Sequence, residues 1–339
     1  MLRPIAVSRC SLHSFEGLHE AIHGTHVEVM QLGRGKLSGS LSHVGIGDFS
    51  LSVGSFSVGV RAQRIATDDN LIVGMLLGAK DRVTHWSFDM RPADVLVIPP
   101  CAEHDSVFHG AAAYAAIRLD LSEVASLFKG EPRLSDPAAW LEKHHYRAHN
   151  SISHAAPRRL PLIISHLAQY QGALSDAAAD FWKRSIMDAV TGAIMHAQPA
   201  DSRGPSPSAM QMVGKVDEYL AATGHRPVHM SEICAHLNVT RRTLHRAFCD
   251  AIGLGPITYL RYKRLCAIHS VLRDSNPATT TVAQVAVQHG FIELGRFSHY
   301  YHTLFGEYPS ETLGSRGSRG DAERQKSGVW HSHARANFG

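Results

Sequence analysis

The stretch TRRTLHRAF, residues 240–248, carries three arginines and one histidine beside apolar residues at helical spacing. The apolar residues recur at i, i+3 and i+4 and share one helix face: Leu244, Ala247 and Phe248. Arg242, His245 and Arg246 have the same spacing on the opposite face, and Thr240 is placed to cap the first turn. Because a guanidinium can donate two hydrogen bonds to guanine, this cationic face predicts base contacts. Phosphate contacts or solvated surface charges fit the same residues.

The preceding segment, MSEICAHLNV at 230–239, predicts a helix that braces the cationic one. Ile233, Cys234 and Leu237 form its apolar stripe. Asn238 follows where a tight turn between helices requires a left-handed residue. The order of helix, short turn and helix is that of a helix-turn-helix unit, whose second helix enters the major groove of DNA.

Residues 281–305 repeat this plan. Thr281 and Gln284 have the spacing of a capping box, and Gly290 occupies the turn. The second helix has an apolar stripe at i, i+4 and i+7: Phe297, Tyr301 and Leu304. The segment 257–273, between the two units, predicts one helix of about 24 Å at about 1.5 Å per residue. Such a strut can hold two reading helices in successive turns of the major groove, about 34 Å apart.

Residues 211–313 resemble the DNA-binding domain of the AraC family of transcription regulators. The second unit carries the resemblance most specifically, because the family's signature recurs there at fixed offsets: Gly290, Phe291, Phe297, Ser298, Phe305, Gly306, Pro309 and Ser310. Two positions depart from the pattern. His229 stands where the family often has a capping Ser or Thr, and His299 stands where a basic residue is common. The second unit is therefore expected to read bases less strongly than the first.

The resemblance implies which side chains meet DNA. In the first unit these are Arg242, His245 and Arg246, and in the second they are Leu294, Arg296, Ser298 and His299. Other cations are interpreted as contacts to the DNA backbone or as no contact at all: Arg241, Arg261, Lys263 and Arg264.

Composition sets the domain plan. The chain has 339 residues, 44% of them apolar and 19% charged, enough for two domains with their own cores. We expect a sensing and dimerisation domain at 1–198, a linker at 199–210 rich in Pro, Ser and Gly, the DNA-binding domain at 211–313, and a disordered basic tail at 314–339. The formal net charge is +4, and the surplus of Lys and Arg lies in the C-terminal third.

The N-terminal half of the sequence predicts an α+β architecture. Short runs rich in β-formers at 26–120 predict a small barrel or sandwich, and 121–198 predict helices. The segment 176–197 is an amphipathic helix whose apolar face either covers the barrel or meets a second copy of the chain. The stretch RPADVLVIPPCAEH resembles the cupin-like regulatory domain of the family, although Ala93 replaces the family's glycine. The resemblance implies one small ligand inside the barrel.

Catalytic and metal chemistry find little support in the sequence. His85 and His104 lack the further ligands of a cupin metal site, so we expect no metal and no cofactor. Arg61 and Arg64 are interpreted as solvated strand ends, with pairing to an acidic effector as the alternative. The five cysteines form no CxxC pair, and no apolar run is long enough for a bilayer or a signal peptide, so we expect a cytoplasmic protein.

These patterns together predict a sequence-specific transcription regulator that is not an enzyme. The resemblance implies an activator that works as a homodimer, binds double-stranded DNA and a small-molecule effector, and has RNA polymerase as a further partner, with no membrane contact. Two alternatives remain open at this point. One is an effector-independent regulator or architectural DNA-binding protein, and the other is a cupin-type metalloenzyme with a DNA-binding appendage.

Overall fold

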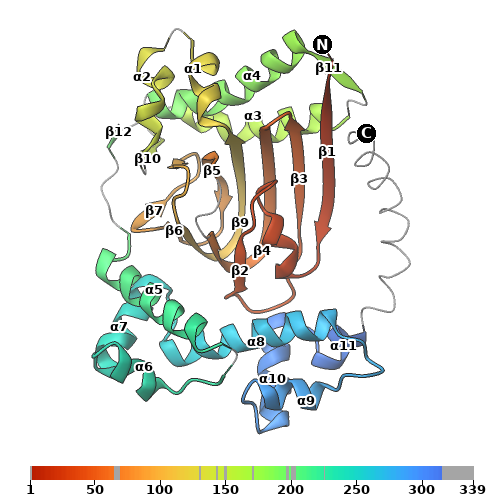
Figure 1. Ribbon diagram of the computed structural model, residues 1–339, viewed down its shortest axis with the longest axis vertical. Coiled ribbons are helices and arrows are strands. Elements are labelled where there is room, and N and C mark those ends of the chain that lie inside the picture. Colours follow the sequence, from red (N-terminus) through yellow and green to blue (C-terminus); the bar gives the residue numbers. More distant parts are fainter. Residues whose placement is uncertain are drawn as a thin grey trace, which may run out of the picture.

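The computed structural model describes residues 2–64, 69–129, 131–142, 144–148, 151–169, 172–195, 198–199, 204–224 and 226–314. An antiparallel sheet with its covering helices comes first, and an all-helical part follows (Figure 1). This arrangement confirms the α+β class. Of the expected tail, Gly314 ends the last helix, and residues 315–339 lie outside the described residues.

Twelve strands form the sheet, in the order β11-β1-β3-β4-β9-β5-β8-β10-β12, with β2 on β4 and β6 between β7 and β9. The strands are β1 (Leu2–Leu12), β2 (Glu28–Gln31), β3 (Gly39–Ile46), β4 (Phe49–Arg64), β5 (Leu71–Ala79), β6 (Val83–His85), β7 (Phe88–Met90), β8 (Val95–Ile98), β9 (His104–Leu119), β10 (His144–Arg147), β11 (Ala173–Ser175) and β12 (Gln198–Pro199).

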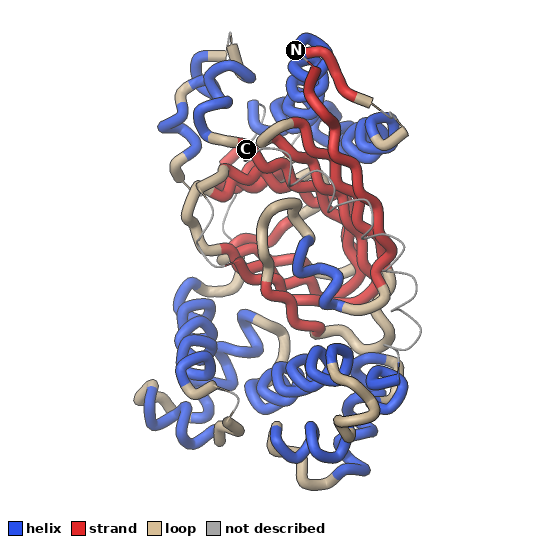
Figure 2. The backbone as a smooth tube through the Cα atoms, turned by 45° about the vertical axis from the view of Figure 1, so that its right-hand side comes forward, coloured by secondary structure: helices blue, strands red, loops and turns tan. Residues whose placement is uncertain are grey.

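The long strands β4 and β9 organise the curvature of this sheet. They pair with each other from Ser50–Arg118 to Arg64–His104. Near one end they also pair with β3 and β5, and near the other with β2 and β6. Among the described residues the strand pairing runs from β11 to β12, and these two end strands do not pair with each other. The structure therefore has a strongly curled, open sheet in place of the expected small barrel (Figure 2).

Four strands lie outside the range 26–120 in which strands were expected. β1 begins at Leu2, and β10, β11 and β12 lie in the region expected to be helical. Each of the three short strands takes its partner from far along the chain: β11 pairs with the start of β1, β10 with β8, and β12 with β10. Local composition therefore does not identify them.

Helices cover the sheet end that lies away from the C-terminal part (Figure 1). They are η2 (Leu121–Glu123), α1 (Val124–Leu127), α2 (Pro132–Ser135), η3 (Pro137–Trp140), α3 (Ser151–Leu167) and α4 (Asp176–Met195). The stripe of α4 that includes Ile186, Ala189 and Val190 shares a core with Val95 and Val97 of β8. The apolar face of this amphipathic helix thus covers the sheet.

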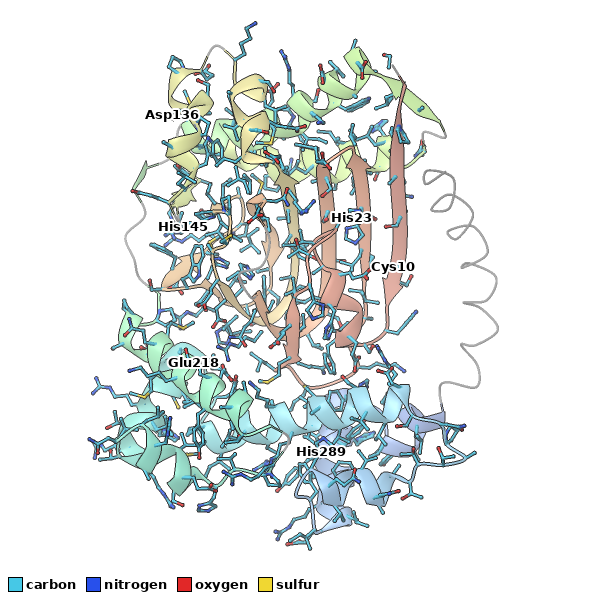
Figure 3. All side chains as sticks on the ribbon, viewed as in Figure 1. Cys10, His23, Asp136, His145, Glu218 and His289 are labelled. Carbon is cyan, nitrogen blue, oxygen red and sulfur yellow. The ribbon has the colours of Figure 1, made fainter. Side chains whose placement is uncertain are left out.

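The turn before β8 shows why a glycine is expected in the cupin-like stretch. Ala93 has a φ of +75°, a backbone region that favours glycine. The turn is nevertheless held, because the buried Asp94 accepts hydrogen bonds from the backbone of Arg91 at 2.9 Å and of Ala148 at 3.0 Å. The side chain of His145, labelled in Figure 3, lies 2.9 Å from Asp94 Oδ2.

Seven helices form the C-terminal part as described: α5 (Pro207–Ala222), α6 (Met230–His236), α7 (Arg241–Ala251), α8 (Pro256–Asp274), α9 (Val282–Gln288), α10 (Leu294–Phe305) and α11 (Pro309–Gly314). α5 begins inside the segment expected to be a linker, because Ser206 caps it through the Ala209 N–H at 3.1 Å and Pro207 fits its first turn. The strut α8 has 19 residues and is therefore about 28 Å long.

The C-terminal helices pack directly against the sheet. One apolar cluster joins Leu18 and Leu37 of the first part to Leu265, Ile268 and others of α8. The short helix η1 (Phe15–Glu20) belongs to this contact, and its Phe15 ring stacks 6.0 Å from that of Phe305. The two helix-turn-helix units lie at opposite ends of α8 (Figure 1).

Candidate nucleic-acid interface

The first reading helix, α7, forms as its sequence predicts. Thr240 caps it, because its hydroxyl accepts a hydrogen bond from the Thr243 N–H at 3.1 Å. Leu244 and Phe248 are fully buried. The cationic face is exposed in full: Arg241, Arg242, His245 and Arg246.

The brace and turn before α7 also follow the sequence pattern. Asn238 has a φ of +49°, the left-handed conformation that the turn requires. The histidine at the expected Ser or Thr position still caps α6, because His229 Nδ1 accepts from the Ser231 N–H at 3.3 Å. Glu232 completes the capping box by accepting from the His229 N–H at 2.9 Å.

The second unit presents a weaker cationic face. Gly290 has a φ of +81° in the turn, and Phe297 and Tyr301 are buried beneath α10. Of the implied contact residues, Leu294, Arg296 and His299 are exposed and Ser298 is half-buried. Arg296 Nε lies 3.2 Å from Glu293 Oε2, so a carboxylate neutralises part of this face.

The cations of the strut have partners within the protein. The Arg261 guanidinium lies 4.1 Å from the Tyr300 ring centroid, and that of Arg264 lies 5.0 Å from the Phe291 ring centroid. Lys263 Nζ donates to Asp217 at 2.6 Å. These three side chains therefore brace the helices around α8.

A largely apolar cavity of about 100 Å³ lies inside the curled sheet. It is lined by η1, by Ile22 in the segment after that helix, and by strand residues that include Val60, Met75, Leu96 and Phe108. Its polar corner comes from β6 and β9. There the Ser106 hydroxyl lies within hydrogen-bond distance of His85 Nδ1 and 3.2 Å from His104 Nε2.

Arg61 is a buried interdomain residue, which corrects its interpretation as a solvated strand end. Its side chain is 1% exposed and makes a bidentate pair with Asp105, at 3.0 and 2.6 Å. It also donates to Asp217 of α5 at 2.7 Å and to the hydroxyl of Tyr259 on α8. Burial opposes the charge of Asp217, but Arg61 and Lys263 outweigh it and lower its pKa. The side chain of Arg64 lies outside the described residues.

A second polar contact fixes the other end of α8. His269 lies between Glu16 of η1, with Nδ1 2.6 Å from Oε1, and Glu307, with Nε2 3.4 Å from Oε1. Burial disfavours its charge, but the two carboxylates raise the pKa of His269 above its ordinary value. Gln31 Nε2 donates to the carbonyl of Leu304 at 2.6 Å and so ties the end of α10 to β2.

Sequence patterns did not reveal the cavity lining or these interdomain contacts. Arg61 lies 156 positions before Asp217 and 198 before Tyr259, so no local period links them. The sequence held one signal of the contact made by Arg61, because this arginine lies in the middle of the β-rich run 58–64. A charged side chain that is buried in a sheet needs a partner of opposite charge.

No gathering of three or more His, Cys, Asp or Glu side chains suited to a metal ion occurs among the described residues. Within the same ranges, none of the helices has both the length and the apolar character needed to cross a bilayer.

Comparison with known proteins places the C-terminal part. The family model described as "Helix-turn-helix domain" matches residues 233–315. The XylDLEGF operon transcriptional activator 2 of Pseudomonas putida is 31% identical over 101 residues, which cover 29% of this chain and 63% of that protein. The probable thc operon regulatory protein of Rhodococcus erythropolis is 28% identical over 128 residues, 38% of this chain and 39% of that one. The chain thus spans less than two thirds of these relatives.

Among solved structures, that of the AraC-like transcriptional activator CuxR aligns with 77% of this chain and 94% of its own, at 15% identity and a TM-score of 0.40. The matched relatives are operon regulators, and the signature residues Gly290 to Ser310 fall inside the matched family range. Residues 233–315 of this chain therefore form a helix-turn-helix domain.

Proposed function

We propose that the chain is a sequence-specific DNA-binding regulator that activates transcription. One observation carries the proposal: two helix-turn-helix units with exposed reading faces stand at the two ends of a single continuous helix, α8. Residues 211–313 bind DNA in this proposal, and residues 1–198 sense and dimerise. The activator role is supported by the related proteins named as transcriptional activators.

Base contacts come chiefly from the first unit. Arg242 and Arg246 read guanine edges in the major groove, with His245 between them, and Arg241 contacts the backbone. The second unit reads through Leu294, Arg296, Ser298 and His299, and less strongly. Its arginine already pairs with Glu293, and His299 stands where a basic residue is common.

A small molecule in the apolar cavity controls this activity. The cavity, at about 100 Å³, is smaller than an engineered apolar cavity of about 150 Å³ that binds benzene, so its occupant is at most one small ring. A homodimer forms through the helical layer on the far side of the sheet, where Leu162 of α3 and Phe181 of α4 are 59% and 63% exposed. RNA polymerase is the further partner of an activator.

The test compares Arg246→Ala with a control, Arg82→Ala, which removes a surface arginine of the sheet paired with Asp89 at 2.8 Å. The ligand is a duplex that the full chain selects from a random library. Arg246→Ala should weaken binding to that duplex by about 1–3 kcal/mol, the value of one bidentate base contact. It should weaken binding to random DNA less, and Arg82→Ala should change neither. Equal losses on both duplexes would make Arg246 a phosphate contact.

A further inference from the structure

One wall of the sheet separates the cavity from the DNA-binding helices. On its inner face, Val60 pairs with Phe108 and Ala62 pairs with Ser106, across β4 and β9. All four residues line the cavity. Because successive side chains on a strand point to opposite faces, the residues between them point out of the cavity.

The outer face of the same wall contacts the C-terminal part. Arg61 lies between Val60 and Ala62, and Asp105 and Val107 flank Ser106. Val107 is fully buried in a cluster with Val213 of α5 and Phe248 of α7. Cavity and DNA-binding helices are therefore separated by the thickness of one strand pair.

The polar cluster on this outer face has balanced charges, with Arg61 buried at its centre and Lys263 at its solvent-exposed edge. Two cations, Arg61 and Lys263, meet two carboxylates, Asp105 and Asp217, and Tyr259 donates to Asp217 at 2.7 Å. Such a cluster is stable only while its hydrogen-bond geometry is kept, because the buried Arg61 has lost its water and depends on the two carboxylates. A small displacement of β4 or β9 therefore changes how firmly α5 and α8 are held.

We propose that Arg61 is the positioning residue through which occupancy of the cavity controls the docking of the C-terminal helices on the sheet. The occupant is a compact, mainly apolar molecule with one polar group, which meets the corner formed by Ser106 and His104. This inference rests on the effector-controlled function proposed above and adds its ligand class and its route. Filling the cavity packs the wall more tightly and so holds the docked arrangement.

Cys266 offers a direct readout of docking. It is a free cysteine of α8, 6% exposed, with Sγ 3.9 Å from the carbonyl of Gln31 on the sheet side. Its thiol becomes reactive only when α8 leaves the sheet, and burial raises its pKa in the docked state. The experiment uses the full chain and follows the labelling of Cys266 by an aromatic disulfide reagent. The other four cysteines are replaced by serine: Cys10, Cys101, Cys234 and Cys249.

A substitution can serve as a permanent occupant of the cavity. Gly74 lies on β5 and lines the cavity, and a Cβ there would meet nothing closer than Leu96 at 4.0 Å. Gly74→Met therefore places a flexible apolar side chain inside without touching Arg61. It should slow the labelling of Cys266 about threefold in the parent chain and leave it unchanged in an Arg61→Met chain, the non-additivity expected of coupled sites.

Arg61→Met by itself should speed the labelling at least about tenfold, because it leaves two carboxylates without their buried partner. Lys183→Met is the matched control, since Lys183 is also buried and pairs with Glu123 at 2.7 Å within the first part. It should lower stability without changing the labelling rate. Tyr259→Phe removes a single hydroxyl from the cluster and gives an intermediate rate, which keeps the test available if Arg61→Met does not fold.

The outcomes separate the inference from the function on which it rests. An equal effect of Gly74→Met with and without Arg61, or equal labelling after Arg61→Met and Lys183→Met, would overturn the coupling even if the protein binds a specific duplex. Failure to select any duplex would overturn the regulator function even if the coupling is observed.

Discussion

Arg242 and Arg246 show what a local pattern can establish about a single residue. Their exposure follows from helical spacing against Leu244 and Phe248, which are fully buried. Arg61 shows the limit of such a local pattern. Its neighbours in the sequence do not indicate burial, yet it is buried because its carboxylate partners come from another strand and from a distant helix. Only tertiary structure brings such partners together.

His269 leads to a pH prediction at this scale. Its raised pKa means that its charge stabilises the folded state below the ordinary histidine value of 6.5, and that this contribution is lost as pH rises through the folded value. The pKa values of Glu16 and Glu307 are lowered to about 2, so their contribution is present above 4.5 and is lost as pH falls toward 2. All three contributions coexist between pH 4.5 and 6.5.

His269→Gln should therefore destabilise the full chain by about 1–3 kcal/mol at pH 6, the cost of an unsatisfied buried polar group. The difference in stability between the parent chain and this variant should become smaller toward pH 9, because His269 of the parent chain loses its charge as pH rises. Urea unfolding across this pH range measures it, with the exposed His302→Gln as control. A loss independent of pH would show that the charge of His269 contributes nothing.

At the scale of elements, the sequence predicted the helices of both units and their turns, because their apolar period is complete within each segment. α7, α8 and α10 and the left-handed turn residues Asn238 and Gly290 all agree with the structure. Strands such as β11, of three residues, were missed because their pairing and not their composition defines them. The curl of the sheet arises in the same way, from long strands that pair with different neighbours at their two ends.

Gly290→Ala tests the turn of the second unit. The added Cβ would lie 2.7 Å from Pro227, in a backbone conformation that costs a non-glycine residue about 1–2 kcal/mol. We expect a loss of at least that size in the free energy of unfolding. Gly214→Ala is the matched control. It lies within α5 with nothing within 4 Å of a new Cβ, and should gain about 0.5–1 kcal/mol. Equal effects of the two changes would contradict the assigned turn.

At the scale of the molecule, the sheet and the C-terminal helices form one contact surface, which the linker pattern at 199–210 did not suggest. Apolar clusters and buried polar groups both cross it. The composition predicted a connection at 199–210, but the affinity between the two parts depends on surfaces that become complementary only after each part has folded. Docking is thus a property of the folded chain, and we propose that it links the cavity to the reading helices.

In the proposed function, α7 and α10 read one duplex in consecutive major-groove turns. The most direct measurement is a hydroxyl-radical footprint of the full chain on a duplex that it selects. We expect two protected segments on one face of the DNA, with centres about 10 base pairs apart, because α8 spans about 28 Å and the groove repeats about every 34 Å. A single protected segment, or two whose centres lie half a turn out of phase, would contradict it.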